Sequence, residues 1–364
     1  MSSEQASNKR STNSFEHTSK RRCLNLRIPK LPDYDSGSTK LYVMGSNDCG
    51  QLGLENVDEV KFPKHIENLD KFRIVYISVG SLYATTLTQN GKIVTWGCND
   101  HGALDRITES KDNERVPSYA QGIDNVTIVK VTCGGNITLA LLSDGHNFLT
   151  KLLGYSKDEN GVLGFSAKNK DKLEQNFFIK YDTDTKSKIA NISVGENHSL
   201  LLTTEGFIYI FGSGDINQLG RRILKHYKWN GLNSEKLAIR RIKKIFAGSY
   251  HNFAVDNDNI IYANVYSFGH TNYGQLGIGE VSTDKVSTPI HITKLVNCQN
   301  IAVGDHNSLA VNEKVHTWGF GKTFALGDRS REDKNLLFEI NCTGIGNKIL
   351  SVGGGSQYSV ILFQ

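Results

Sequence analysis

The sequence predicts an all-β protein, a β-propeller built from four-stranded blades. Two motifs recur six times along the 364 residues. The first is an apolar strand that ends in glycine, as at Ile93–Gly97, and it is followed by a polar loop and a Leu-Gly pair or its relic. The second motif reads apolar-x-apolar-Gly, and its copies centre on Gly80, Gly134, Gly195, Gly248, Gly304 and Gly355. A self-similarity of roughly 50 to 60 residues indicates a repeat array.

The order of the motifs predicts how the ring closes. Each repeat is expected to form four short antiparallel strands, which can bury their faces only against neighbouring repeats. The array opens with a first motif at Leu41–Gly45 and ends with a second motif before Phe363. One blade must therefore combine strands from the two ends of the array, which removes the last exposed sheet edges. We predict a disordered basic tail over residues 1–39 and a six-repeat propeller over residues 40–364.

The composition supports this fold and narrows the class of protein. The chain has 35 glycines and five prolines, which suits strands joined by tight turns. No apolar run approaches the roughly 18 residues that span a bilayer, so no membrane partner is expected. The six cysteines are scattered without a C-x-x-C pair. We interpret them as reduced, buried, small apolar residues.

Positive charge gathers in two places. Residues 1–40 hold eight Lys/Arg and four Asp/Glu, so most of the net charge of +5 lies in the tail. In the tail, Lys9-Arg10 and Lys20-Arg21-Arg22 have the spacing of a bipartite nuclear import signal; a solvated basic tail is the alternative. Residues 221–244 hold nine Lys/Arg and one Glu. That stretch either binds DNA, with an affinity that falls steeply with salt, or is a solvated loop.

Carboxylates recur at equivalent positions of the repeats. An acid lies three residues after the first-motif glycine in three copies, and the longer third loop carries its acid one position later: Asp48, Asp100, Asp215 and Asp158. Glu196 and Asp305 follow second-motif glycines. Because equivalent loops of a propeller emerge at the same end, we expect acids around one mouth, facing a basic partner surface. The alternative for Asp48, Asp100 and Asp215 is that each caps its own loop.

The histidines predict structure rather than catalysis. His198 and His251 lie three residues after their glycines, so we expect them to share one packing or hydrogen-bonding task. His306 lies two residues after its glycine and is expected to point toward the loop face. No zinc-ligand spacing and no Ser-His-Asp arrangement stands out, so we expect no metal, no cofactor and no covalent chemistry. The pattern favours a binding surface.

Four segments make the sequence recognisable: Trp96–Arg106, Asp158–Phe165, Gln218–Arg221 and Trp318–Gly327. Over about residues 40–364 the sequence resembles the regulator of chromosome condensation family. It is most similar to the nuclear exchange factors, which release nucleotide from the small GTPase Ran. The irregular Asp-Glu-Asn-Gly loop at residues 158–161 is the feature more specific to these members.

The resemblance implies roles for particular residues. Asp158 looks like the acid that the family needs for nucleotide release. Asp48, His306 and Arg221 fall at positions that face the GTPase, and Asn197 stands where the exchange factors tend to carry an acid. The stretch Phe165–Leu173, with Lys168 and Lys170, corresponds to the family's β-wedge. Together with the repeated acids Asp100 and Asp215, these residues form the predicted partner-binding set.

The same resemblance implies the partners and the place of action. They are Ran, a nuclear import receptor and nucleosomal DNA, the last two reached through the basic tail of a nuclear, chromatin-associated protein. The family has seven blades, whereas six repeats are found here, as if one unit were missing between Val311 and Val315. This difference sustains an alternative function, a propeller scaffold that binds proteins or chromatin without exchange activity.

Overall fold

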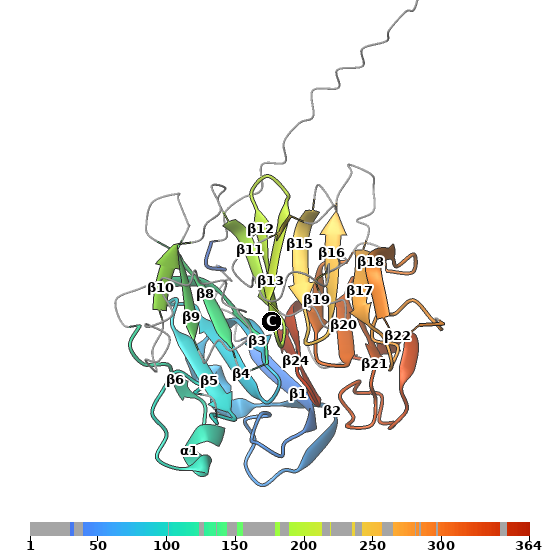
Figure 1. Ribbon diagram of the computed structural model, residues 1–364. Coiled ribbons are helices and arrows are strands. Elements are labelled where there is room, and N and C mark those ends of the chain that lie inside the picture. Colours follow the sequence, from blue (N-terminus) through green and yellow to red (C-terminus); the bar gives the residue numbers. More distant parts are fainter. Residues whose placement is uncertain are drawn as a thin grey trace, which may run out of the picture.

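The computed structural model describes most of the propeller. The described residues are 30–32, 39–100, 102–123, 127–135, 137–143, 151–155, 179–182, 189–212, 219, 235–236, 242–256, 265–280, 282–283, 285–295, 298–342 and 348–364. Within them, six four-stranded antiparallel sheets stand around a common axis (Figure 1). We number these sheets as blades 1 to 6 in chain order.

Five blades each take four consecutive strands. Blade 2 contains β3 (Ile74–Val79), β4 (Tyr83–Thr88), β5 (Ile93–Gly97) and β6 (Ser118–Tyr119). Blade 3 contains β7 (Thr127–Cys133), β8 (Thr138–Ser143), β9 (Lys151–Tyr155) and β10 (Ile179–Asp182). Blade 4 contains β11 (Ile189–Val194), β12 (His198–Thr203), β13 (Ile208–Gly212) and β14 (Glu235–Lys236). Blade 5 contains β15 (Ile242–Ala247), β16 (His251–Asp256), β17 (Val265–His270) and β18 (Lys285–His291). Blade 6 contains β19 (Asn300–Val303), β20 (Asn307–Val311), β21 (Val315–Gly319) and β22 (Lys334–Ile340).

Blade 1 closes the ring with strands from distant parts of the chain. It joins β1 (Lys40–Ser46) and β2 (Glu59–His65) to β23 (Ile349–Gly354) and β24 (Tyr358–Phe363), in the order β2-β1-β24-β23. The innermost strands of neighbouring blades contact one another all the way round, from β3 through β7, β11, β15 and β19 to β23. The predicted propeller, its six repeats and its mixed closing blade are therefore confirmed. In blade 6, Val311 pairs with Val315 in one hairpin.

In the residues that the structure describes, two short helices lie outside the sheets. A 3-10 helix over Glu67–Phe72 connects blades 1 and 2, and α1 (Lys111–Arg115) lies in the loop between β5 and β6. Ser110 caps α1, because its hydroxyl accepts a hydrogen bond from the backbone N–H of Asn113. No helix in the described part of the chain is long and apolar enough to cross a membrane.

The second-motif glycines form a ring at one end of the channel. A Cβ atom on Gly134 would lie 1.8 Å from the carbonyl oxygen of Gly195, and one on Gly195 would lie 2.2 Å from that of Gly248. The contact repeats between Gly304 and Gly355, at 2.2 Å. Adjacent blades approach too closely here for any side chain, so glycine is required by packing. We call these six residues the glycine ring.

The Leu-Gly motif docks each first-motif loop on the next blade. The indole N–H of Trp96 donates to the carbonyl oxygen of Gln51 at 3.1 Å, and that of Trp318 donates to Gln275 at 2.8 Å. Both tryptophans are fully buried. Gly277 has a φ of +69°, and a Cβ there would lie 2.8 Å from the Trp318 Nε1 atom. A loop of one blade and a strand of the next are thus held together by a buried aromatic ring.

The cysteines follow the sequence interpretation only in part. The five that the structure describes are free thiols, as predicted. Cys133 and Cys298 are buried, but Cys49, Cys98 and Cys342 are half-buried. The prediction of full burial is therefore wrong for these three, which lie in loops.

Candidate protein-binding face

One end of the propeller carries both families of loops. The first-motif glycine of each complete repeat lies against the second-motif turn of the same blade. A Cβ on Gly97 would lie 2.7 Å from Tyr83 Cα, and one on Gly212 would lie 2.6 Å from His198 Cα. The polar loops and the glycine turns therefore share one end, drawn with α1 at the bottom of Figure 1. We call it the loop face.

The residues that directly follow the glycine ring meet over the channel. Ser81 Oγ lies 2.8 Å from Glu196 Oε2 and 3.2 Å from Asp305 Oδ1. Ser249 Oγ contacts the same two carboxylates, Glu196 at 3.4 Å and Asp305 more closely. Two serines from blades 2 and 5 thus hold two carboxylates from blades 4 and 6. We call Ser81, Glu196, Ser249 and Asp305 the acidic hub.

The acidic hub brings together two of the six acids that the sequence singled out. In the sequence, Ser81 lies 115 residues from Glu196 and 224 residues from Asp305, so no local pattern could have paired them. The sequence marks these residues only by their position in the repeat, because each hub residue comes directly after a second-motif glycine. The two serines were missed, since their sequence contexts resemble those of ordinary turn residues.

An aromatic patch lies beside the acidic hub, and His306 is at its centre. The His306 ring stacks on Tyr250 with centroids 5.3 Å apart and meets Tyr273 edge-on at 4.8 Å. Phe320 packs against Tyr273 at 5.0 Å. His306 is half-buried, and this burial lowers its pKa, although the Asp305 carboxylate opposes the shift. Flat aromatic rings next to carboxylates suit a Lys or Arg side chain of a partner.

The outer loops place Asp48 and Asp100 on the surface, away from the hub. Asp48 is exposed and accepts a hydrogen bond from Ser46 Oγ at 2.8 Å. The Asp100 side chain is 62% exposed and pairs with Lys111 Nζ of α1. Both contacts are local, since Ser46 and Lys111 lie next to or within the loop that carries each aspartate, and they agree with the alternative that each aspartate caps its own loop.

The asparagine before each of these aspartates also holds the loop. Asn47 Nδ2 donates to the carbonyl oxygens of Leu54 and Val57, at 2.9 and 2.7 Å. Its Oδ1 accepts from the backbone N–H of Leu52 at 2.9 Å. Asn99 repeats the arrangement in blade 2, where Oδ1 accepts from Leu104 at 3.0 Å. The amide can donate and accept at once, which a carboxylate cannot do.

The two histidines in register have the shared task that the sequence predicted. His198 Nε2 lies 2.7 Å from Asn252 Oδ1, and His251 Nε2 lies 2.8 Å from Ser308 Oγ. Each bond joins one blade to the next, and both rings are fully buried. Burial lowers the pKa of His198 to about 4 and also lowers the pKa of His251 well below its usual value. These residues connect blades and are not exposed to a partner.

The remaining predicted residues are only partly within the described chain. Asn197 is half-buried in the turn that contains Glu196 of the hub. Asp158, Phe165, Lys168, Lys170, Asp215 and Arg221 lie outside the described residues, as do Lys9, Arg10, Lys20, Arg21 and Arg22. Among the residues with a described structure, no group of three His, Cys, Asp or Glu could hold a metal ion.

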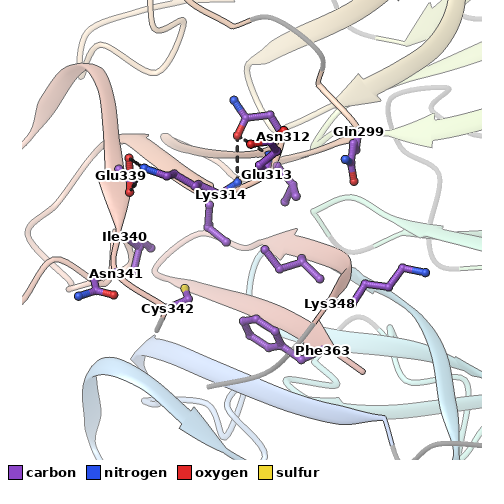
Figure 2. Close-up of a pocket in the computed structure, with 13 residues that line it drawn as sticks. Gln299, Asn312, Glu313, Lys314, Glu339, Ile340, Asn341, Cys342, Lys348 and Phe363 are labelled. Carbon is purple, nitrogen blue, oxygen red and sulfur yellow. Dashed lines mark hydrogen bonds and ion pairs between the residues drawn. The ribbon is translucent and has the colours of Figure 1, made fainter. Parts of the chain in front are cut away.

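A cleft of about 540 Å³ lies at the opposite end from the loop face, between blades 6 and 1 (Figure 2). It was not predicted. Lys314 reaches across to Glu339 at 2.8 Å, and Asn312 holds the hairpin by accepting from the N–H of Lys314 at 3.0 Å. Cys342 lines the cleft, and burial raises the pKa of its thiol to about 11, which makes it a poor nucleophile.

Comparisons with known proteins agree with this architecture. The chain is 32% identical to the protein pim1 of Schizosaccharomyces pombe over 83% of its own length and 58% of the relative's. It is 27% identical to the human regulator of chromosome condensation, covering 88% of this chain and 90% of that protein. It is also 27% identical to the guanine nucleotide exchange factor SRM1 of Saccharomyces cerevisiae, covering 78% and 64% of the two chains. It thus spans less than two thirds of both yeast relatives.

A solved structure shows the same fold. The crystal structure of Prp20p from Saccharomyces cerevisiae, whose binding properties to Gsp1p and histones are described with it, matches with a TM-score of 0.70 at 23% identity. The match covers 93% of each chain. A family profile described as the RCC1-like domain matches residues 40–311. With its two motifs, closed ring and loop face, the chain belongs to the RCC1-like domain family.

Proposed function

We propose that this protein is a guanine-nucleotide exchange factor for the small GTPase Ran and that it acts through its loop face. Membership of the family and similarity to a relative named as an exchange factor support the activity. The observation that carries the assignment of the face is the acidic hub beside the aromatic patch. Together they offer negative charge and flat aromatic surface at the centre of one end of the ring.

The chemistry of this face selects a basic partner surface. A Lys or Arg of the GTPase would pair with Glu196 or Asp305 and lay its stem against Tyr250 or His306. The exposed Asp48 adds negative charge farther out on the same face, which speeds encounter more than it adds affinity. Asp100 contributes less, because Lys111 already pairs with it.

Exchange on this scheme needs no bond to be made or broken in the protein. A nucleotide held with picomolar affinity has a binding free energy of about 16 kcal/mol, so unaided release is slow. The exchange factor binds the empty GTPase more tightly than the loaded one, and by linkage each ligand weakens the other. We assign the promoting acid to Asp158 and the wedge to Phe165–Leu173, by resemblance, with Arg221 and Asp215 as further contacts. GTP then replaces GDP by re-entering the vacated site.

The basic tail fits a nuclear, chromatin-associated exchange factor. Lys9-Arg10 and Lys20-Arg21-Arg22 would bind an import receptor and, in the nucleus, DNA phosphates. Binding to DNA through this tail would weaken steeply as salt rises, while exchange by the loop face would change less. A tail-deleted form separates the two functions.

The test is release of a fluorescent GDP analogue from Ran of the same species. We expect wild-type protein and a form lacking residues 1–35 to accelerate release, and Asp158→Ala to abolish most of the acceleration. Asp305→Asn should lower it about tenfold, equivalent to about 1.4 kcal/mol of lost partner binding. The matched control is Glu339→Gln, which removes an acid paired with Lys314 at the opposite end and should leave exchange unchanged.

Two results would contradict the proposal. Equal losses in Asp305→Asn and Glu339→Gln would show that the acidic hub is not the contact surface. Failure of folded wild-type protein to accelerate release would leave the alternative, a non-catalytic propeller that binds proteins or chromatin. Co-sedimentation with nucleotide-free Ran distinguishes a scaffold that binds Ran from one that does not.

A further inference from the structure

A second ring of side chains lies at the end of the channel away from the glycine ring. It consists of the residue four positions before each second-motif glycine, and all six lie on the innermost strands: Tyr76, Lys130, Asn191, Lys244, Asn300 and Ser351. A β-bulge directly precedes five of them, as between Ile128 and Lys130. We call this ring the basic mouth.

The two lysines of the basic mouth are held by neutral groups. Lys130 Nζ donates to Asn191 Oδ1 of the next blade and lies 5.8 Å from the ring centroid of Tyr76. Lys244 Nζ donates to the carbonyl oxygen of Gln299. Gln299 also lines the cleft of Figure 2, so the basic mouth and that cleft adjoin. In the described part of the chain, neither lysine forms an ion pair with a carboxylate.

The two ammonium groups carry uncompensated charge in a confined place. Burial, reinforced by the positive charge of Lys244, lowers the pKa of Lys130 to about 8. Burial also lowers the pKa of Lys244. A protonated lysine has three donors, of which the contacts above use one in each case. Desolvated cations without a counter-ion are costly, and a bound anion would offset that cost.

The channel between the basic mouth and the glycine ring holds a small cavity, which Lys130 lines and Lys244 does not. A cavity of about 50 Å³ runs along the axis, and Tyr76, Lys130 and Thr132 are among its lining residues. Ser351 belongs to the same ring, and its hydroxyl is buried without a hydrogen-bond partner. The space is of the order of one or two water molecules. A folded peptide or a nucleic acid strand would not enter it.

We propose that the basic mouth binds one free oxyanion of the phosphate class, held by the Lys130 and Lys244 ammonium groups from alternate blades. Lys130 and Lys244 lie close enough for the charge of one to act on the other, and two such cations suit a multiply charged tetrahedral anion. Asn191 positions Lys130, and Gln299 positions Lys244. This site lies at the other end of the ring from the loop face, so it is independent of nucleotide exchange.

The test is calorimetric titration of the full chain with inorganic phosphate, at ionic strength fixed with sodium chloride. We expect one site per chain, and a dissociation constant at least tenfold larger in Lys130→Met and in Lys244→Met. Lys314→Met is the matched control, because that lysine lies at the same end but pairs with Glu339. It should bind phosphate as wild type does. Thermal melting of each variant verifies that it is folded.

The outcomes distinguish a specific phosphate site from nonspecific attraction of anions. No saturable heat in wild type, or equal affinity in wild type and Lys130→Met, overturns the proposal. A parallel titration with a short DNA duplex tests the macromolecular source of phosphate. If the duplex binds and its affinity falls in Lys130→Met while inorganic phosphate does not bind, the surface is a nucleic-acid contact and the small-ligand proposal is wrong.

As a second readout, phosphate should raise the pKa of Lys130, followed by NMR of the labelled lysine, because a bound anion stabilises the charged form. A structural role for the lysine would leave this pKa unmoved by phosphate.

Discussion

The two ends of the channel are built from the same repeat, yet they differ in how much the sequence is constrained. At one end every blade contributes glycine, because the backbone of the next blade leaves no space for a Cβ. At the other end, four residues earlier on the same strands, a bulge precedes five of the six positions, which hold four residue types: Tyr, Lys, Asn and Ser. Backbone contact between blades fixes the residue type, whereas contact through side chains leaves it free to vary.

The largest expected effect comes from adding one methyl group to the glycine ring. Gly134→Ala would place Cβ 1.8 Å from a carbonyl oxygen, so blades 3 and 4 must separate. We expect a loss of about 3 kcal/mol in stability at pH 7. The urea midpoint, followed by the fluorescence of buried Trp96 and Trp318, measures it. Gly353→Ala is the control, since its Cβ would meet side-chain carbons of Val79 and Ile77, at 3.1 Å or more, and no backbone; equal losses would refute the argument.

A second contrast lies among the loops, where blade 2 has aspartate in place of the glycine of Leu-Gly. Asp105 has a left-handed φ of 49°, and both carboxylate oxygens are buried without partners. Asp105→Gly should therefore raise stability by about 2 kcal/mol at pH 7, by relieving strain and an unpaired polar group. No gain, or a loss, would mean that the aspartate has a stabilising contact.

The pH dependence of stability gives a second test of the Asp105→Gly variant. Burial raises the pKa of Asp105 to about 8, against about 3.9 in the unfolded chain. The folded form keeps its proton in this window and the unfolded form does not, so wild-type stability falls as pH rises from about 4 to 8. Asp105→Gly lacks this loss, and the difference between the two urea midpoints should widen toward pH 8.

At the basic mouth, removing a charge should stabilise the protein. Lys130→Met keeps the stem and removes a buried ammonium, and we expect a gain of about 1 kcal/mol at pH 7 in phosphate-free buffer. The folded-state pKa of about 8 lies below the unfolded value of about 10.4. Wild-type stability should therefore rise with pH between these values, and that of Lys130→Met should not. A lower urea midpoint in the variant would contradict this account.

The smallest change at pH 7 is expected at a hydrogen bond between blades. His198→Gln can still donate to Asn252, so the loss should stay below about 1 kcal/mol. The folded-state pKa of about 4 lies below the unfolded value of about 6.5, so wild-type stability is lost as pH falls through this window. Melting curves from pH 7 to pH 4 should show a shallower acid loss in the variant. An identical acid profile would assign the loss to other groups.

The sequence was sufficient for what the repeat imposes. Gly80 and its five counterparts, the mixed blade 1 and the shared role of His198 and His251 all follow from position within a repeat, because equivalent positions meet equivalent neighbours. The same logic predicted acids at one mouth, and Glu196 and Asp305 do meet there.

What the sequence did not reveal depends on distances across the ring. Ser81 meets Asp305 only because blades 2 and 6 face one channel, and nothing local marks that serine. Lys130 lies in β7 and Lys244 in β15, two blades further on, and nothing local in either strand shows that the two charges influence each other. The asparagine clamps at Asn47 and Asn99 were also missed, since Asn and Asp are equally common in turns and only the donors of the amide distinguish them here.

The closing blade determines how long the newly made chain keeps an unpaired strand edge. β1 pairs with β2 on one edge and with β24 on the other, so its second edge has no partner until β24 is synthesised. At about 5–20 residues per second, a gap of about 300 residues leaves that edge open for roughly 15 to 60 seconds. During this interval the partly made propeller has two unpaired sheet edges. A chain that ended before residue 349 would lack β23 and β24, and those edges would stay unpaired.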